Sequence, residues 1–189
     1  NYTYKYIFPV AHSSELNSEG VEQAIHYYGL TQILKVELMH RISDTYGPVV
    51  YSKFGNGEVN SVDTQQEAYV AFFSDLDKGI DAMDKYLKNG GDDLSLNAND
   101  MLNAKSIKGW IKFANSLRLR LAMRISNVDK TNAEIQAKKA LANPYGVLEA
   151  ANEIIQVSGH GYTNPLIAIG GWGEAYMGAT MASVLNGYE

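Results

Sequence analysis

Hydrophobic and polar residues alternate with the spacing of an amphipathic helix most clearly between residues 64 and 88. Thr64 followed by Glu67 forms a capping-box pattern, which predicts where this helix begins. Gly90 and Gly91 predict its end, because glycine readily adopts the left-handed conformation of a C-terminal cap. Apolar side chains at steps of mostly three and four residues predict one core-facing side. That side consists of Tyr69, Phe72, Phe73, Leu76, Ile80, Met83 and Leu87.

The charged residues of the same segment fall off its apolar face, so we expect them to lie in solvent. Two acidic pairs, 75/77 and 81/84, contain the residue types of a glycosidase. That reaction needs its two carboxylates about 5 to 9.5 Å apart in a cleft, and a solvated helix face is the preferred interpretation. The charged residues are Asp75, Asp77, Lys78, Asp81, Asp84, Lys85 and Lys88.

Weaker helical patterns flank this segment and predict an all-α chain. Residues 21–43 are apolar on most sides, which is typical of a helix buried between neighbours. Shorter patterns predict a helix over 131–141 and a last one over 174–185, whereas 1–20 reads as irregular or briefly helical. An extended piece is expected at 48–51, and a loop-like region from 145 to 173 with one short extended piece near 154–157. A further helix over 103–127 places Ile107, Trp110, Ile111, Ala114, Leu117, Leu121, Ala122 and Ile125 inward.

Length, charge and cysteine content exclude several classes of function. The 189 residues suffice for one domain, or one and part of another. The 16 Lys and Arg against 21 Asp and Glu give a net charge of -5, which argues against a nucleic-acid surface. The chain has no cysteine, so thiol nucleophiles, disulfides and Cys-liganded metal sites are excluded. No stretch approaches 18 consecutive apolar residues, so no membrane-spanning helix is predicted.

The sequence also predicts no metal site and no cofactor. His26 and His40 share a predicted helix but lie about 21 Å apart along its axis, too far to bind one ion. Residues 93–100 space oxygen ligands as a calcium loop does, but the glycine at the sixth position is missing and Ala104 replaces the bidentate glutamate. No phosphate-binding loop, nucleophile elbow or zinc-protease motif occurs. The composition and the spacing of these residues therefore reveal no catalytic site.

Aromatic and amide side chains in the predicted loops are the remaining candidates for ligand binding. Planar rings stack on the apolar faces of sugars, and amides hydrogen-bond to hydroxyl groups. The same side chains would suit a protein partner equally well, so the residue chemistry leaves both alternatives open. The candidate ligand-binding residues are Trp172, Tyr162, Asn164, Tyr51 and Tyr145.

Four sequence blocks resemble the SusD/RagB-like outer-membrane lipoproteins. The run from Ile33 to Tyr51 is similar to that family's helix followed by D-x-Y-G-x-[IV]-P-Y, with Val50 in place of the usual proline. Residues 71–77 are similar to its next helix, and 110–126 to its K-W-x-K-F-A-N-S-L-[KR]-L-R-L-A-M-R helix. The last block comprises Asn164-Pro165-Leu166 and residues 171–181. The four blocks occur in the family's order over about 150 residues.

This resemblance implies a fold of stacked tetratricopeptide-like helix pairs with long irregular loops. It further implies a non-catalytic nutrient-binding protein, lipid-anchored to the outer membrane at the cell surface, that binds a glycan or a peptide. Such proteins deliver their ligand to a TonB-dependent transporter of the SusC type. The alternative is a helical protein–protein interaction module with no small-molecule ligand.

The family's members are several hundred residues long, so we expect residues 1–189 to form a single helical region belonging to a longer chain and a larger SusD-like fold. Because ligand contacts differ between members, the resemblance assigns no binding residue. It suggests structural roles for Arg118, Arg120 and Arg124, as partners of acidic side chains on neighbouring helices or as caps of loop carbonyls.

Overall fold

The computed structural model describes residues 3–55, 61–97, 100, 102, 104–153, 155, 167, 170–173 and 176–187. Within these residues the only β-structure is an isolated antiparallel bridge between Val49 and Asp63. The prediction of an all-α fold is therefore confirmed. The α-helices are α1 (Phe8–Ser18), α2 (Ile25–Tyr46), α3 (Gln65–Lys88), α4 (Ile107–Ile125), α5 (Lys130–Ala142) and α7 (Ala179–Leu185), with short helical turns η1 (Thr3–Ile7), η2 (Glu22–Ala24) and η4 (Ala151–Glu153).

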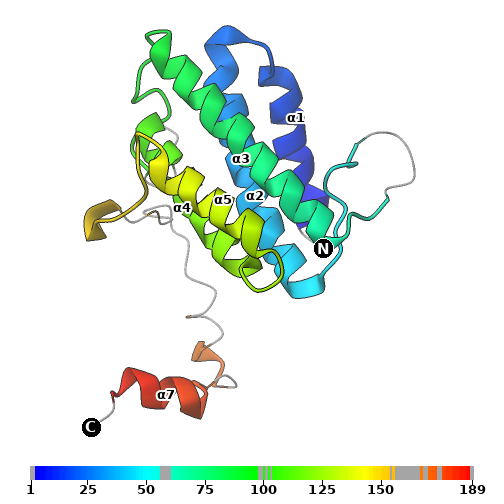
Figure 1. Ribbon diagram of the computed structural model, residues 1–189, viewed down its shortest axis with the longest axis vertical. Helices are drawn as coiled ribbons and strands as arrows, with labels where there is room; N and C mark the ends of the chain where they lie inside the picture. The colour runs from blue at the N-terminus through cyan, green and yellow to red at the C-terminus, as the bar shows by residue number, and fades with distance from the viewer. Residues whose placement is uncertain are drawn as a thin grey trace.

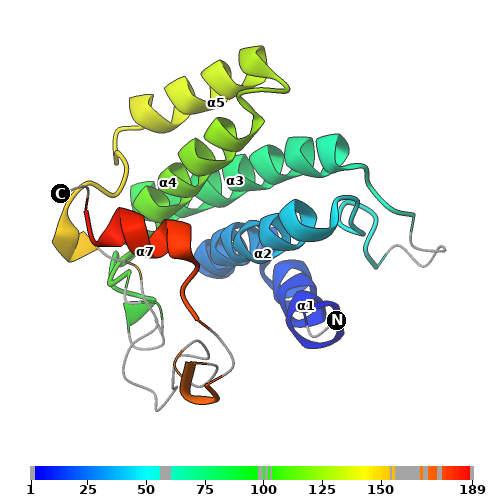
Figure 2. The same cartoon turned by 90° about the horizontal axis from the view of Figure 1, so that it is seen from below.

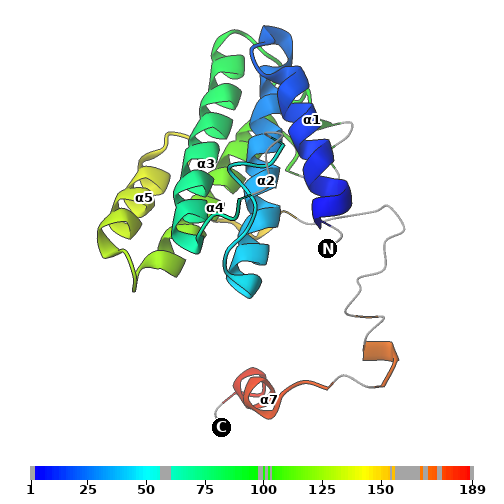
Figure 3. The same ribbon diagram turned by 90° about the vertical axis from the view of Figure 1, so that its right-hand side faces the viewer.

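Helices α1 to α5 lie side by side, and successive helices run in alternate directions (Figure 1 and Figure 3). Viewed from below, they fan out as a staggered row from α1 to α5 (Figure 2). Each helix packs on the next one along the chain, and α4 also contacts α2. This arrangement of antiparallel helix pairs agrees with the predicted tetratricopeptide-like stacking.

Helix α3 begins and ends where the sequence pattern predicts. The Thr64 hydroxyl accepts a hydrogen bond from the Glu67 backbone N–H, and the Glu67 carboxylate accepts one from the Thr64 N–H. Phe72, Leu76 and Met83 on its apolar face are completely buried. Helix α3 therefore forms the centre of the core, between α2 and α4.

Two of the helix ends that differ from the sequence prediction are set by local caps. Helix α2 continues past the expected stop and includes Asp44, Thr45 and Tyr46, ending only at Gly47, which has a positive φ of 82°. Helix α4 begins at Ile107 instead of 103, because the Ser106 side chain caps it by accepting from the Gly109 N–H. In both cases the end is set by a local cap that the apolar periodicity does not reveal.

The first 20 residues form more helix than the sequence suggests. Helix α1 is a complete 11-residue helix that packs against α2. Phe8 is buried with its ring 4.5 Å from the ring of Phe54 and 5.8 Å from that of Tyr51, measured between centroids. Glu15 accepts a hydrogen bond of 2.6 Å from Lys35 of α2. Contacts with distant residues therefore stabilise a helix that has little amphipathic pattern of its own.

Helix α7 lies apart from the five packed helices (Figure 1 and Figure 3). It covers only the second half of the segment predicted as helical, and none of its residues is buried. Large apolar side chains before and within it are exposed, which is unusual for a packed helix. They are Met177, Met181, Val184 and Leu185.

Candidate functional site

Tyr51, one of the predicted ligand-binding residues, lies in the core. Its side chain is only 5% exposed, and its hydroxyl donates a 2.7 Å hydrogen bond to Asp75 Oδ2. Its ring packs edge-on against Phe72 at 4.8 Å. Burial raises the pKa of Tyr51 well above its ordinary value, and the Asp75 carboxylate raises it further. Because Tyr51 is almost completely buried, it belongs to the hydrophobic core and offers no free ring face to a sugar.

Tyr145, the second predicted residue, anchors the segment that follows α5. Its hydroxyl donates a 2.8 Å hydrogen bond to Asp84 Oδ1 on α3. Burial and the Asp84 carboxylate together raise the pKa of Tyr145 to about 12. Asn115 on α4 binds the neighbouring Gly146 carbonyl at 2.9 Å. Tyr145 and Gly146 therefore tie this segment to α3 and α4, and the hydroxyl of the half-buried Tyr145 is already occupied.

Trp172 has the exposed ring that ligand stacking requires. Its side chain is 69% exposed, and Tyr176, four residues later, is 88% exposed. Two further predicted residues, Tyr162 and Asn164, lie outside the described residues. Of the five predicted ligand-binding residues, Trp172 alone is described with an open aromatic face, and its role in binding stays a prediction.

The prediction that the charged residues of α3 are solvated is wrong for Asp75, which is buried, whereas Asp77 and Asp84 are partly exposed. Asp75 is buried and binds Lys78 at 2.8 Å as well as Tyr51, with Lys35 at 3.6 Å. Asp84 binds Tyr145, and Lys88 at 2.5 Å. These two carboxylates connect α3 to residues of other segments.

Asp77 is the third aspartate, and it pairs with a buried arginine. Arg118 of α4 is only 1% exposed and donates hydrogen bonds of 2.5 Å to Asp77 and 2.7 Å to Gln136. Lys139 of α5 lies 2.7 Å from the same Asp77 oxygen, so this cluster joins three helices. The structural role expected for Arg118 is confirmed. It is not found for Arg120, which is exposed and forms no ion pair with the described part of the chain.

Both histidines of α2 are buried. His40 lies 3.0 Å from the Val36 carbonyl oxygen through Nδ1. His26 is buried between Tyr86 and Tyr27, with ring centroids at 4.0 and 4.1 Å, and neither of its nitrogens has a hydrogen-bond partner. Among the described residues, no three His, Asp or Glu side chains are grouped so that they could hold a metal ion.

The buried His26 predicts a loss of stability in mild acid. Burial lowers the pKa of His26 below its ordinary value of 6.5, so the folded state binds fewer protons than the unfolded state as pH falls through 6.5. The free energy of unfolding should therefore decrease between pH 7.5 and 5.5. Urea denaturation at these two pH values measures the change, and His26→Phe should reduce the difference. An equal pH difference in the wild type and the variant would contradict this assignment.

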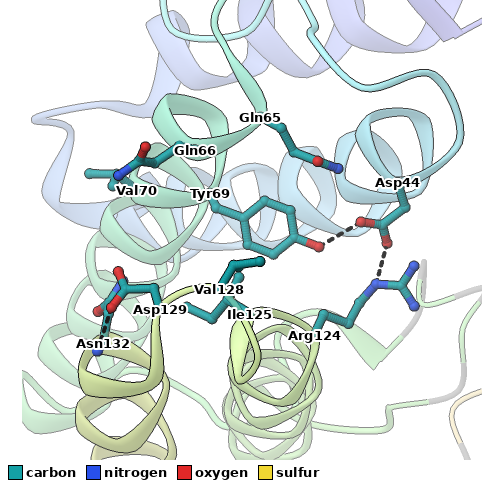
Figure 4. A pocket seen from close by; sticks show the side chains of 10 residues that line it. All are labelled: Asp44, Gln65, Gln66, Tyr69, Val70, Arg124, Ile125, Val128, Asp129 and Asn132. Atoms are coloured by element: carbon teal, nitrogen blue, oxygen red, sulfur yellow. Dashed lines mark hydrogen bonds and ion pairs between the residues drawn. The ribbon is translucent and has the colours of Figure 1, made fainter.

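A groove that the sequence did not predict lies where the first turn of α3 meets the corner between α4 and α5 (Figure 4). Its volume is about 660 Å³. We call it the α3–α4 groove. It is lined by Asp44, Gln65, Gln66, Tyr69, Val70, Arg124, Ile125, Val128, Asp129 and Asn132.

A hydrogen-bonded triad closes one end of the α3–α4 groove (Figure 4). The Tyr69 hydroxyl donates to Asp44 Oδ1 at 2.6 Å, and Arg124 Nε lies 2.7 Å from Asp44 Oδ2. Burial raises the pKa of Tyr69 above its ordinary value, and the bond to Asp44 adds to this. Arg124 thus has the acidic partner on a neighbouring helix that was expected. The triad keeps the C-terminal turn of α2 against α3 and α4.

No described helix is both long and apolar enough to cross a membrane.

A comparison with curated proteins finds no significant match. Solved structures, in contrast, match closely. A SusD homologue from Bacteroides vulgatus is 64% identical over the whole chain, with a TM-score of 0.95. A chitin-binding SusD homologue from Flavobacterium johnsoniae is 37% identical over 89% of the chain, with a TM-score of 0.82. The chain spans 38% and 35% of the lengths of these two proteins.

A third similar structure, a SusD homologue from Bacteroides uniformis, is 33% identical over 85% of the chain, with a TM-score of 0.73, and the chain spans 33% of its length. The family described as SusD and RagB outer-membrane lipoproteins matches residues 1–189. The predicted resemblance is thereby confirmed, and the chain belongs to the SusD-like family of outer-membrane lipoproteins.

Proposed function

We propose that this chain is part of a nutrient-binding protein, lipid-anchored at the cell surface, that captures a glycan and delivers it to a TonB-dependent transporter. The protein binds its ligand without catalysis. The observation that carries this proposal is the exposed Trp172, in a chain that is 37% identical to a chitin-binding homologue over 89% of its length.

The position of Trp172 supports stacking on a sugar. An exposed indole can cover the apolar face of a pyranose ring, and Tyr176 nearby adds a second exposed ring. The aromatic rings of α1 to α3 that face the core are already packed, as Phe72 illustrates. A glycan that stacks on this part of the protein would therefore use exposed rings such as Trp172 and not the core-facing rings of the helices.

Calorimetric titration with chitin oligosaccharides tests this proposal. Trp172→Ala should weaken binding about fivefold or more, because one aromatic contact contributes about 1 kcal/mol. Tyr46→Ala is the matched control, because Tyr46 is equally exposed but lies at the end of α2. Oligosaccharides of cellulose and starch in the same titration define the preferred sugar. Binding that is unchanged by Trp172→Ala, or the absence of binding to all of these sugars, would contradict the proposal.

The alternative function, a protein-interaction module, is favoured by one observation, the aliphatic side chains exposed in the α3–α4 groove. Val70 and Val128 lie there with more than half of their surface in water. This groove and Trp172 belong to different segments, so a protein could carry both surfaces. The two functions are therefore separable by variants at each place.

A further inference from the structure

Helix α7 is amphipathic, but its apolar side lies in water. Met181, Val184 and Leu185 are three and four residues apart, so they fall on one stripe of the helix, and Ser183 lies on the opposite side. The side chains of the stripe are 57%, 54% and 65% exposed. An apolar stripe of this kind normally faces a core. Among the described residues, this one has no such core to face.

A helix as short as α7 needs a packing partner. It has 7 residues, whereas isolated helices shorter than about 12 residues are only marginally stable in water. Its N-cap, Gly178, provides no side-chain hydrogen bond that would stabilise the first turn. None of its residues is buried, and it lies apart from the five packed helices (Figure 1 and Figure 3). The stability of α7 must therefore come from packing against something other than these helices.

In a solved structure, the region that matches this chain is part of a longer polypeptide. The Bacteroides vulgatus homologue matches the whole of this chain with a TM-score of 0.95, and the chain spans 38% of that homologue's length. More than half of the homologue therefore lies outside the matched region and belongs to the same polypeptide. Covalent attachment gives such a segment a high effective concentration, which favours it over a separate molecule as the partner of an apolar face.

We propose that the apolar face of α7, formed by Met181, Val184 and Leu185, packs against the part of the longer SusD-like polypeptide that lies outside residues 1–189. The residue types of α7 suit a permanent contact of this kind. The helix contains no aromatic ring for a sugar to stack on and no charged side chain that would attract a transient partner. Contacts that form once, during folding, are more apolar than those of partners that associate and separate. The proposal concerns folding, so it does not depend on glycan binding at Trp172.

The test compares the longer protein with the chain of residues 1–189. Leu185→Ser should lower the melting temperature of the longer protein by about 2 °C or more, because it removes a leucine from an apolar contact, and should leave that of residues 1–189 unchanged. Ser183→Gln, on the opposite side of the same helix, is the matched control and should change neither melting temperature. Hydrogen exchange gives a second measurement. The amides of α7 should be protected in the longer protein and should lose this protection in residues 1–189.

Three results would overturn the proposal. The first is that Leu185→Ser and Ser183→Gln affect the longer protein equally, or that its α7 amides exchange freely. The second is dimerisation of the longer protein, measured by sedimentation and removed by Leu185→Ser, because a second copy would then cover α7. The third is binding of the longer protein to vesicles of phosphatidylethanolamine and phosphatidylglycerol that Leu185→Ser removes. Trp172→Ala should leave the exchange of α7 unchanged, so failure here is distinguishable from failure of the proposed glycan binding.

Discussion

Asp77→Ala is expected to lower the free energy of unfolding by about 3 kcal/mol, an effect far larger than its position on a charged helix face suggests. The variant removes the only carboxylate within the described part of the chain that pairs with the buried Arg118. Arginine stays protonated in proteins, so it cannot escape the cost of burial by losing its charge. The expected value lies at the lower end for broken buried pairs because Asp77 itself is about one-third exposed.

Asp81→Ala is the matched control, since Asp81 lies one turn further along α3, is exposed, and forms no ion pair with the described residues. It should change stability by less than about 0.5 kcal/mol. Arg118→Met should cost less than Asp77→Ala, because an apolar side chain of similar length fills the space and leaves no buried charge. Urea denaturation of the three variants gives the comparison. Equal effects of Asp77→Ala and Asp81→Ala would refute the structural role of the pair.

Gly29→Val is expected to destabilise the protein by about 3 kcal/mol, the upper end of the range for overpacked cores. Helices α2 and α3 lie close together where Gly29 faces Gly79. A Cβ atom on Gly29 would lie 2.7 Å from the Gly79 carbonyl oxygen and 2.8 Å from Cγ of Met83. The Gly79 oxygen belongs to the backbone, and Met83 Cγ is not the flexible far end of its side chain, so a small side-chain movement would relieve neither contact. The two helices would therefore have to move apart.

Smaller substitutions at this crossing should follow a rank order. Gly79→Ala should cost less than Gly29→Val, because its Cβ would meet Gly29 O and Ile33 at 3.0 Å and because alanine gains about 1 kcal/mol of helix propensity over glycine. Ser74→Val, on the exposed side of α3, controls for placing a β-branched residue in a helix. Thermal melts of all three variants test the order. A Gly29→Val cost no greater than that of Ser74→Val would exclude close packing at this crossing.

Helix α3 shows which structural features a local sequence pattern can predict. Its capping box and its apolar face depend on residues three and four positions apart, so the local sequence contains the information that sets them. The start of α4, in contrast, does not follow from the apolar pattern. The Ser106 cap and the Asp93 carbonyl that binds the Ile107 N–H end the preceding loop, and neither follows an apolar period.

The candidate sites were less predictable than the fold. Aromatic residue type alone did not separate Trp172, whose ring is open, from Tyr51, whose ring is in the core. The α3–α4 groove left almost no signal, since its lining comes from three separate segments. A lone valine in a polar turn, Val128, was the only local clue.

The sequence by itself determined that the chain is helical, where α3 begins and ends, and to which family it belongs, because helix periodicity and sequence blocks are read from neighbouring positions. The tertiary structure alone decided that Asp75 and Asp77 are structural, that Tyr51 is buried and that a groove exists beside Val128. Each of these properties depends on a partner tens of residues away. The amphipathic pattern shows which side of a helix is polar, but only the packing of other helices shows whether that side meets water or an opposite charge.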